Sequence, residues 1–405
     1  MMEEITLQET RSDNRSQTIL FMMSIILVAF NLRPAITSVG PVIGLIRDDL
    51  QLENWNVAFI MSLPLIAFAI LSPLTASIAK KISTELTLVI GLALLVFGMT
   101  IRTFPMNFLL FFGTLCVGLG IAVCNVLLPS IIKDRFPLKV GLMTGLYTTC
   151  MGLMATTASA LSLPLADGAG FGWQWSMYIW VIPAVLAFFI WLYIWRKAQS
   201  RKSQDLQVTM KEEGSIFKSK LAWAVACFMG LQSMIFYVTI SWLPEILMDR
   251  GIPAYEAGYM LSYFQLVGLP VSFIVPVIAS RLKTQRIIVY VVNSGFLLGI
   301  ILLMNVESLG MLTLAVTLLG FSSSSNFSLA LAFLSFRAKD RFDAARLSGM
   351  AQSIGYGLAA IGPVMLGYMY DLTLSWTMPL YTLMIVTLFI MVFGTFAGQN
   401  KHVFD

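Results

Sequence analysis

One arginine lies where a charge is least expected. Arg33 occurs in the segment FNLRPA (residues 30–35), near the middle of a long apolar stretch. A charged residue at the centre of a bilayer costs at least ~2.5 kcal/mol, and such residues usually face a bundle interior or a watery cavity. A guanidinium carries five N–H donors in a planar fork, which suits planar, multi-oxygen or linear anions. Arg33 is therefore the leading candidate for binding a small anion.

No acidic residue is expected to lie opposite Arg33. Asp and Glu are missing from the middle of every apolar stretch, and the nearest, Glu245, lies near the end of its own. Two interpretations stay open. Arg33 either contacts a solute, or it bonds carbonyls freed by Pro34, or Asn125 or Gln352, and only holds helices together. The general behaviour of intramembrane charges favours contact with a solute.

Other polar and aromatic residues within the apolar stretches could line the same site. An internal repeat, described below, maps Arg33 onto Phe236, one helical turn from Gln232 on the same face. For each residue except Arg33, hydrogen bonding between helices is an equally good explanation. The candidate substrate-binding residues are Arg33, Thr37, Asn125, Tyr147, Gln232, Phe236, Tyr237, Gln265, Asn326, Gln352 and Tyr356.

The composition indicates that most of the chain lies in a membrane. Hydrophobic residues make up 58% and charged residues 12% of the 405 positions, and a soluble domain carries about twice that charged fraction. About 20 apolar residues cross the hydrocarbon core as a helix. We therefore predict an all-α integral membrane protein with twelve transmembrane helices, at 18–44, 56–79, 86–103, 107–131, 141–165, 174–195, 221–247, 256–280, 287–305, 309–336, 346–370 and 376–397.

Several kinds of chemistry find no support in the residues. The one histidine, His402, is in the C-terminal tail, and the four cysteines fall inside predicted helices without metal-ligand spacing. No nucleophile–base pair is recognisable, and no Walker sequence for an ATP-driven pump occurs. We expect neither an enzyme nor a bound metal or cofactor.

The basic residues predict the topology. If the N-terminus is cytoplasmic, 22 of the 26 Lys and Arg residues fall in cytoplasmic segments. The positive-inside rule then places both termini in the cytoplasm. The basic loops reflect this topology, and a nucleic-acid partner is not expected.

Two sequence patterns recur at nearly constant spacing. The pattern P-x-x-A-S-x-x-K at residues 73–80 returns 203 positions later at 276–283, and the tetrapeptide KDRF at 133–136 returns 206 positions later at 339–342. Because each half holds six spans, its ends lie on one side of the membrane and the two halves are parallel repeats. We predict six-helix bundles at 1–195 and 221–405, joined by a polar cytoplasmic linker at 196–220.

Three motifs together resemble the cyanate permease and 2-nitroimidazole transporter family of the major facilitator superfamily. They are NLRP (31–34) running into TSVGP (37–41), GLQS (230–233) with WLP (242–244), and LSGMAQS (347–353). The resemblance covers essentially the whole chain. It implies the two-repeat fold, a bacterial inner-membrane carrier, and a site near mid-membrane lined by helices 1, 4, 7 and 10, with 3, 6, 9 and 12 facing lipid. One departure is the loop segment LTASIAKK (74–81), which lacks the superfamily's usual Asp and Gly.

These observations together predict a secondary transporter that works by alternating access. A small anion such as cyanate is the expected substrate, with Arg33 as its receptor. The alternative is a multidrug or nitroimidazole-type carrier of neutral aromatic compounds, since a chain with 24 Met and 28 Phe residues offers an adaptable surface. We expect a monomer surrounded by membrane lipid.

Overall fold

Long helices make up nearly all of the computed structural model, which describes residues 18–52, 54–202 and 215–405. The N-terminal half (residues 18–202) contains a helix at 18–29 and then α2 (Pro34–Thr37), α3 (Val39–Asp49), α4 (Asn54–Ile82), α5 (Thr84–Ile101), α6 (Asn107–Arg135), η1 (Pro137–Lys139), α7 (Val140–Leu163), η2 (Pro164–Gly168), α8 (Gly172–Tyr178) and α9 (Val181–Lys202). The C-terminal half (residues 215–405) contains η3 (Ile216–Lys218), α10 (Lys220–Asp249), α11 (Ala254–Arg281), α12 (Arg286–Asn305), α13 (Leu309–Phe336), α14 (Arg341–Thr373) and α15 (Thr377–Ala397). The described residues form no strand, and the predicted all-α class is confirmed.

Eleven helices of the described chain are long and apolar enough to cross a membrane. The twelfth long helix, α14, spans 33 residues but lies outside that set. Its first turns carry Arg341, Asp343 and Arg346, and its middle contains several Gly and Ser residues together with Gln352, which lowers its hydropathy. A helix of this composition is stable within a membrane bundle when its polar face packs against other helices rather than against lipid.

The first predicted span, 18–44, is not one continuous helix. The helix at 18–29 ends in a turn at 30–33, α2 follows at once, and α3 begins after Ser38. Pro34 explains the break because it lacks an N–H for the helical hydrogen-bond ladder. In a membrane, such a break requires donors and acceptors from neighbouring helices.

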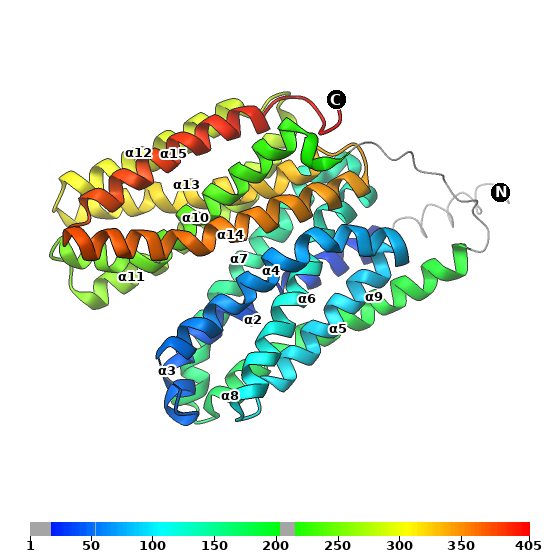
Figure 1. Cartoon of the computed structure of the whole chain (residues 1–405), viewed down its shortest axis with the longest axis horizontal. Coiled ribbons are helices and arrows are strands. Elements are labelled where there is room, and N and C mark those ends of the chain that lie inside the picture. Colours follow the sequence, from blue (N-terminus) through cyan, green and yellow to red (C-terminus); the bar gives the residue numbers. More distant parts are fainter. Residues whose placement is uncertain (1–17, 53, 203–214) are drawn as a thin grey trace, which may run out of the picture.

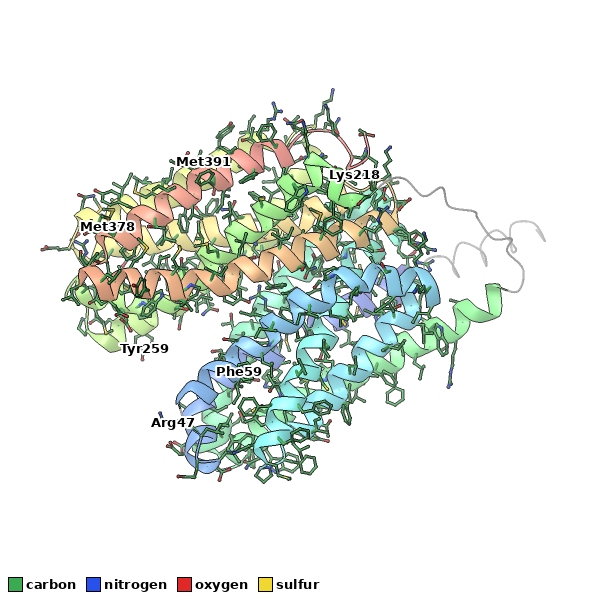
Figure 2. The ribbon with its side chains drawn as sticks, in the orientation of Figure 1. Arg47, Phe59, Lys218, Tyr259, Met378 and Met391 are labelled. Carbon is green, nitrogen blue, oxygen red and sulfur yellow. The ribbon has the colours of Figure 1, made fainter. Side chains whose placement is uncertain are left out.

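The two halves meet at one end and diverge toward the other (Figure 1). The start of the helix at 18–29, the end of α9, the start of α10 and the C-terminus lie toward the end where the halves meet, which we call the termini end. Lys218 lies at the termini end and Arg47 at the opposite end of the N-terminal half (Figure 2). Of the predicted linker, residues 203–214 lie outside the described chain, and α9 continues into it as far as Lys202.

Glycines allow the halves to approach closely. A β-carbon at Gly349 of α14 would lie 2.5 Å from the Ser72 carbonyl oxygen of α4, next to Pro73. A β-carbon at Gly141 of α7 would overlap the Pro276 carbonyl oxygen of α11. The two prolines of the sequence repeat therefore each lie at a helix crossing between the halves, opposite a glycine.

Burial separates central from peripheral helices. In the most apolar stretch of α6, 83% of the residues are buried, and in those of α10 and α13 the share is 67%. In the corresponding stretches of α9, α12 and α15 only 39% of the residues are buried. Met378 and Met391 lie along the outer side of α15 (Figure 2). Helices 4, 7 and 10 are thus more buried than helices 6, 9 and 12, as the resemblance implies. The first span, at 44%, is less buried than helix 3 (α5), at 50%. Burial therefore does not separate helix 1 from helix 3 in the expected way.

Candidate functional site

A cavity of about 90 Å³ lies between the two halves. Five segments line it: the broken first span, α7, α10, α11 and α13. Its wall includes Arg33, Thr37, Thr148, Met151, Thr156, Phe236, Phe264, Gln265, Ser272, Ser324 and Phe327. One water needs about 10–15 Å³ by this measure, so the cavity holds several waters or a solute of a few heavy atoms.

Arg33 lies against two aromatic rings from the other half. Its Cζ is 4.8 Å from the ring centroid of Phe327 and 5.4 Å from that of Phe236. Cation–π contacts of this kind contribute about 0.5–1 kcal/mol at exposed sites and ~2 kcal/mol when desolvated. The rings of α10 and α13 therefore position a cation that the N-terminal half supplies.

The guanidinium of Arg33 forms no hydrogen bond and no ion pair with any described residue. Its side chain is half-buried, and its nitrogens are not among the buried polar atoms that lack a partner. The N–H donors thus reach the space of the cavity. A charged donor group that the surrounding chain leaves without an acceptor is suited to hold an anion or a polar oxygen.

The break in the first span is held by side-chain hydrogen bonds. Asn31 Nδ2 donates to the Leu27 carbonyl at 2.6 Å. Thr37 Oγ1 donates to the Arg33 carbonyl at 3.1 Å and to the Ala155 carbonyl of α7 at 3.2 Å. These side chains donate hydrogen bonds to backbone carbonyls at the interruption. The bond to Ala155 also connects the turn that carries Arg33 to α7, which fixes the position of the turn.

A second arginine supports the same turn. Arg102, directly after α5, is 1% exposed and donates from Nη1 to the Ala35 carbonyl at 2.6 Å. Burial lowers the pKa of Arg102 to about 10, and its guanidinium remains charged at neutral pH. Arg102 was not singled out from the sequence, and nothing in its residue type or spacing predicts this contact.

The three candidate tyrosines lie close to one another, and two of them are near Arg33. Tyr237 and Tyr356 are near enough to Arg33, and to each other, for electrostatic interaction, and Tyr147 is near Tyr356. The buried hydroxyl of Tyr147 has no hydrogen-bond partner among the described residues. Helices α7, α10 and α14 thus bring three phenols to one region beside the cavity.

Asn326, Gln352 and Gln232 bond to other side chains in this structure. Asn326 and Asn293 of α12 exchange amide hydrogen bonds of 2.9 and 3.2 Å, away from the cavity wall. Gln352 Nε2 donates to the Ser348 hydroxyl at 2.9 Å, and Ser348 Oγ contacts the Asn125 carbonyl at 3.5 Å.

Gln232 is buried as well, and its Nε2 donates to the Ser233 hydroxyl at 2.8 Å, while its Oε1 lacks a partner in the described chain. Of the eleven candidates, Arg33, Thr37, Phe236 and Gln265 line the cavity. The role of each stays a prediction.

Phe327 is one of the cavity residues that the sequence did not indicate. It follows the polar run Ser322–Asn326, yet as one more apolar residue in an apolar span it carries no signal of its own. Thr148 was missed for a similar reason, because a threonine that bonds its own helix is common in membrane spans. Its hydroxyl also lies 2.9 Å from the Ser272 carbonyl of α11, which joins the halves.

Comparison with known proteins decides the family. The model of the Major Facilitator Superfamily matches residues 20–360. The chain belongs to this superfamily. Its all-helical architecture, with twelve long helical segments among the described residues, is that of a superfamily transporter, and the predicted fold class is confirmed.

Two full-length relatives are transporters. This superfamily member is 43% identical to an uncharacterized transporter of Bacillus subtilis (strain 168), over 97% of both chains. It is 36% identical to the 2-nitroimidazole transporter of Escherichia coli (strain K12), over 95% of this chain and 97% of the relative. A cyanate transport protein of the same E. coli strain is 24% identical over 66% of this chain and 68% of its own.

Solved superfamily structures have the same fold. A proton:xylose symporter bound to 6-bromo-6-deoxy-D-glucose matches with a TM-score of 0.75 at 12% identity, over 96% of this chain and 98% of that one. A superfamily transporter in the outward conformation matches with a TM-score of 0.69 at 15% identity, over 95% and 99% of the two chains. The superfamily member described here is a multi-pass membrane protein and a secondary transporter of a small solute, as predicted, rather than an enzyme.

Proposed function

We propose that this transporter carries a small anion of the cyanate class and that Arg33 is its receptor. The observation that supports this most directly is the guanidinium of Arg33, which faces the cavity between the halves without a hydrogen bond or ion pair to any described residue. The small volume of the cavity, about 90 Å³, favours a solute of few heavy atoms.

A second candidate substrate is a nitroimidazole-type compound. The rings of Phe236 and Phe327 beside Arg33 provide apolar faces for a planar aromatic solute, and stacked or edge-on aromatic pairs are favourable. The 36% identity to a 2-nitroimidazole transporter supports the same candidate. The polar oxygens of a nitro group would then take the place of the anion at Arg33.

The arrangement of the halves supports transport by alternating access. They are in contact at the termini end and diverge at the opposite end (Figure 1), and the glycine contacts of α7 and α14 close the termini side of the cavity. We propose that a solute enters from the opposite end, and that rocking of the two halves about Arg33 and its rings then opens the termini end.

The orientation in the membrane is part of this proposal. We place the termini end in the cytoplasm of a bacterial inner membrane, because most Lys and Arg residues are expected there. The test replaces Arg47 or Lys218 by cysteine in a cysteine-free background. A membrane-impermeant thiol reagent should label R47C in intact cells and K218C only after permeabilisation. The reverse pattern would invert the topology. A monomeric state stays a prediction.

The substrate is tested by uptake into proteoliposomes that contain the full-length chain. Labelled cyanate and labelled 2-nitroimidazole are compared, each with the other as competitor. Arg33→Ala should abolish uptake and leave the melting temperature near that of the wild type. No described carboxylate pairs with Arg33, so its removal leaves no buried carboxylate without a partner. Leaving a buried charge unpaired in that way would cost ~3–5 kcal/mol.

Matched variants separate binding from folding. Arg33→Lys keeps the charge but loses the planar fork, so it should rescue uptake poorly. Arg47→Ala makes the same change at an exposed arginine far from the cavity and should transport normally. Full uptake by Arg33→Ala would remove Arg33 from the site. A collapse of its melting temperature would show instead that Arg33 holds the helices together.

A further inference from the structure

A second and larger cavity lies at the termini end, away from Arg33. Its volume is about 460 Å³, within the 300–1,000 Å³ typical of ligand sites. The wall comes from the helix at 18–29 and from α4, α5, α6 and α9 of the N-terminal half, and from the start of α14. Both halves of the transporter therefore contribute to this one cavity.

The wall of this cavity is strongly basic. Five basic residues line it, with Glu85 as the only acidic lining residue among those described. These basic residues are Lys80, Lys81, Arg135, Lys197 and Arg341. Two carboxylates lie beside these cations: Glu85 is 3.6 Å from Arg135 Nη2, and Asp134, outside the wall, is 3.6 Å from Arg341 Nη1. Lys81 and Lys197 form no ion pair with any described residue, so the cations still outnumber the carboxylates. Like charges around one space repel, and an anion in that space removes the repulsion.

The wall of this cavity also contains apolar and aromatic residues, and Phe21 contacts Arg135 at 4.4 Å from ring centroid to Cζ. Leu20 and Phe21 of the first helix face Tyr193, Ile194 and Trp195 of α9. Tyr193 is 55% exposed on α9, a helix at the lipid-facing side of the bundle. Tyr and Trp are enriched at the depth of the lipid headgroups. The cavity thus lies where the protein surface changes from lipid to water.

We propose that this cavity binds the phosphate of an anionic phospholipid from the leaflet at the termini end. The phosphate would lie among Lys81, Lys197 and Arg341, with the acyl chains along α9. Basic cavities between transmembrane helices are suited to anionic headgroups. A soluble phosphate compound would use the cations equally well, but it would not contact the apolar residues of the wall.

The position of Arg341 implies that a bound lipid would connect the two halves. Arg341 belongs to α14 of the C-terminal half, whereas Lys81 and Lys197 belong to the N-terminal half. A phosphate bound by all three links the halves at the termini end. The bound lipid therefore favours the conformation in which that end is closed, because a ligand shifts an equilibrium toward the state it binds better.

The test measures lipid binding to the purified full-length transporter in detergent. Melting curves are recorded with increasing phosphatidylglycerol, with phosphatidylcholine of the same acyl chains, and with inorganic phosphate alone. Phosphatidylglycerol should raise the melting temperature of the wild type in a saturable way, since a ligand of the folded state stabilises it. Neither phosphatidylcholine nor inorganic phosphate should reproduce this shift.

Two double variants with the same change of charge locate the site. Lys81→Gln with Lys197→Gln removes two cations of the cavity. Each basic residue near an anionic lipid contributes roughly a fivefold gain in affinity, so this variant should bind phosphatidylglycerol about 25-fold more weakly. Lys218→Gln with Lys283→Gln removes two exposed cations outside the cavity wall and should bind like the wild type.

Each other outcome overturns the proposal. Equal lipid affinity of the two double variants would show that the attraction is not located at this cavity. Saturable stabilisation by inorganic phosphate that competes with the lipid would assign the cavity to a soluble phosphate compound. If the double cavity variant does not fold, Lys197→Gln alone serves, with an expected loss of about fivefold.

Discussion

The carboxylate of Asp134 lies 3.6 Å from Nη1 of Arg341 and so joins the two copies of the repeated KDRF tetrapeptide. Ser130 strengthens this junction, because its hydroxyl donates to the Arg341 carbonyl at 2.6 Å. Lys133 is also near enough to Asp340 for electrostatic attraction. The end of α6 and the start of α14 therefore exchange opposite charges where the halves meet, and the closed termini end depends partly on these contacts.

Neutralising this junction should loosen the termini end. Arg341→Gln should raise the population with that end open, by up to about fivefold, because a partly exposed ion pair contributes ~0–1 kcal/mol. Spin labels at positions 139 and 283, measured in detergent without anionic lipid, would report a longer distance. Exchanging the charges, with Asp134→Arg and Arg341→Asp, should restore the wild-type distribution. An unchanged distribution in Arg341→Gln would contradict a role for this pair.

A methyl group at Gly349 should hinder closure of the same end. The added carbon would lie 2.5 Å from the Ser72 carbonyl oxygen, and overpacking of this kind costs typically ~1–3 kcal/mol. Gly349→Ala should therefore slow transport by about 5- to 100-fold, although alanine favours the helix itself. Gly357→Ala is the control, since a β-carbon there meets no atom within 4 Å. Equal transport rates of the two variants would refute the argument.

Removing one ring beside Arg33 should weaken solute binding without unfolding the protein. Phe327→Leu keeps an apolar side chain but loses the cation–π contact, which contributes about 0.5–2 kcal/mol. The KM for uptake should rise by about 2- to 30-fold, and Phe327→Tyr should stay near the wild type. Phe264→Leu is matched to it, because Phe264 lines the cavity without a described ring contact to Arg33. A larger effect from Phe264→Leu would show that Phe327 acts by packing alone.

Arg102 should act by positioning the turn that carries Arg33. In Arg102→Met the Ala35 carbonyl loses its charged donor, a bond of about 1.5–3 kcal/mol. The same change removes a costly buried charge, and replacement of such charges by apolar residues is often neutral. We expect a small change in melting temperature but a higher KM, with partial rescue by Arg102→Lys. A large drop in melting temperature with unchanged KM would make Arg102 a purely structural residue.

The general architecture could be predicted because its cause is local. Long apolar stretches must become helices in lipid, where every backbone N–H and C=O needs a partner within its own segment. The interruption within the first span was not predicted. Composition alone marked 18–44 as one stretch, whereas Pro34 divides it and the side chains of Asn31, Thr37 and Arg102 stabilise the division.

The candidate site was only partly predictable. Arg33 was evident from the sequence because a charge among apolar residues is costly wherever the helix packs. Asn326 looked equally suitable as a polar residue in an apolar span, yet it bonds Asn293 of a neighbouring helix. The sequence shows that a helix carries a polar side chain, but it does not show whether that side chain contacts a cavity or another helix.

The sequence by itself determined that the chain lies in a membrane, that it is helical and that it has two repeated halves. It also determined that Arg33 places a charge within a membrane span. Each of these follows from the type and order of residues along one chain. Only the tertiary structure decided that Phe236 and Phe327 flank Arg33, that Arg102 reaches the Ala35 carbonyl, and that Arg341 meets Asp134. These partners are far apart in sequence and come together through helix crossings, whose geometry depends on close packing of both surfaces rather than on hydropathy.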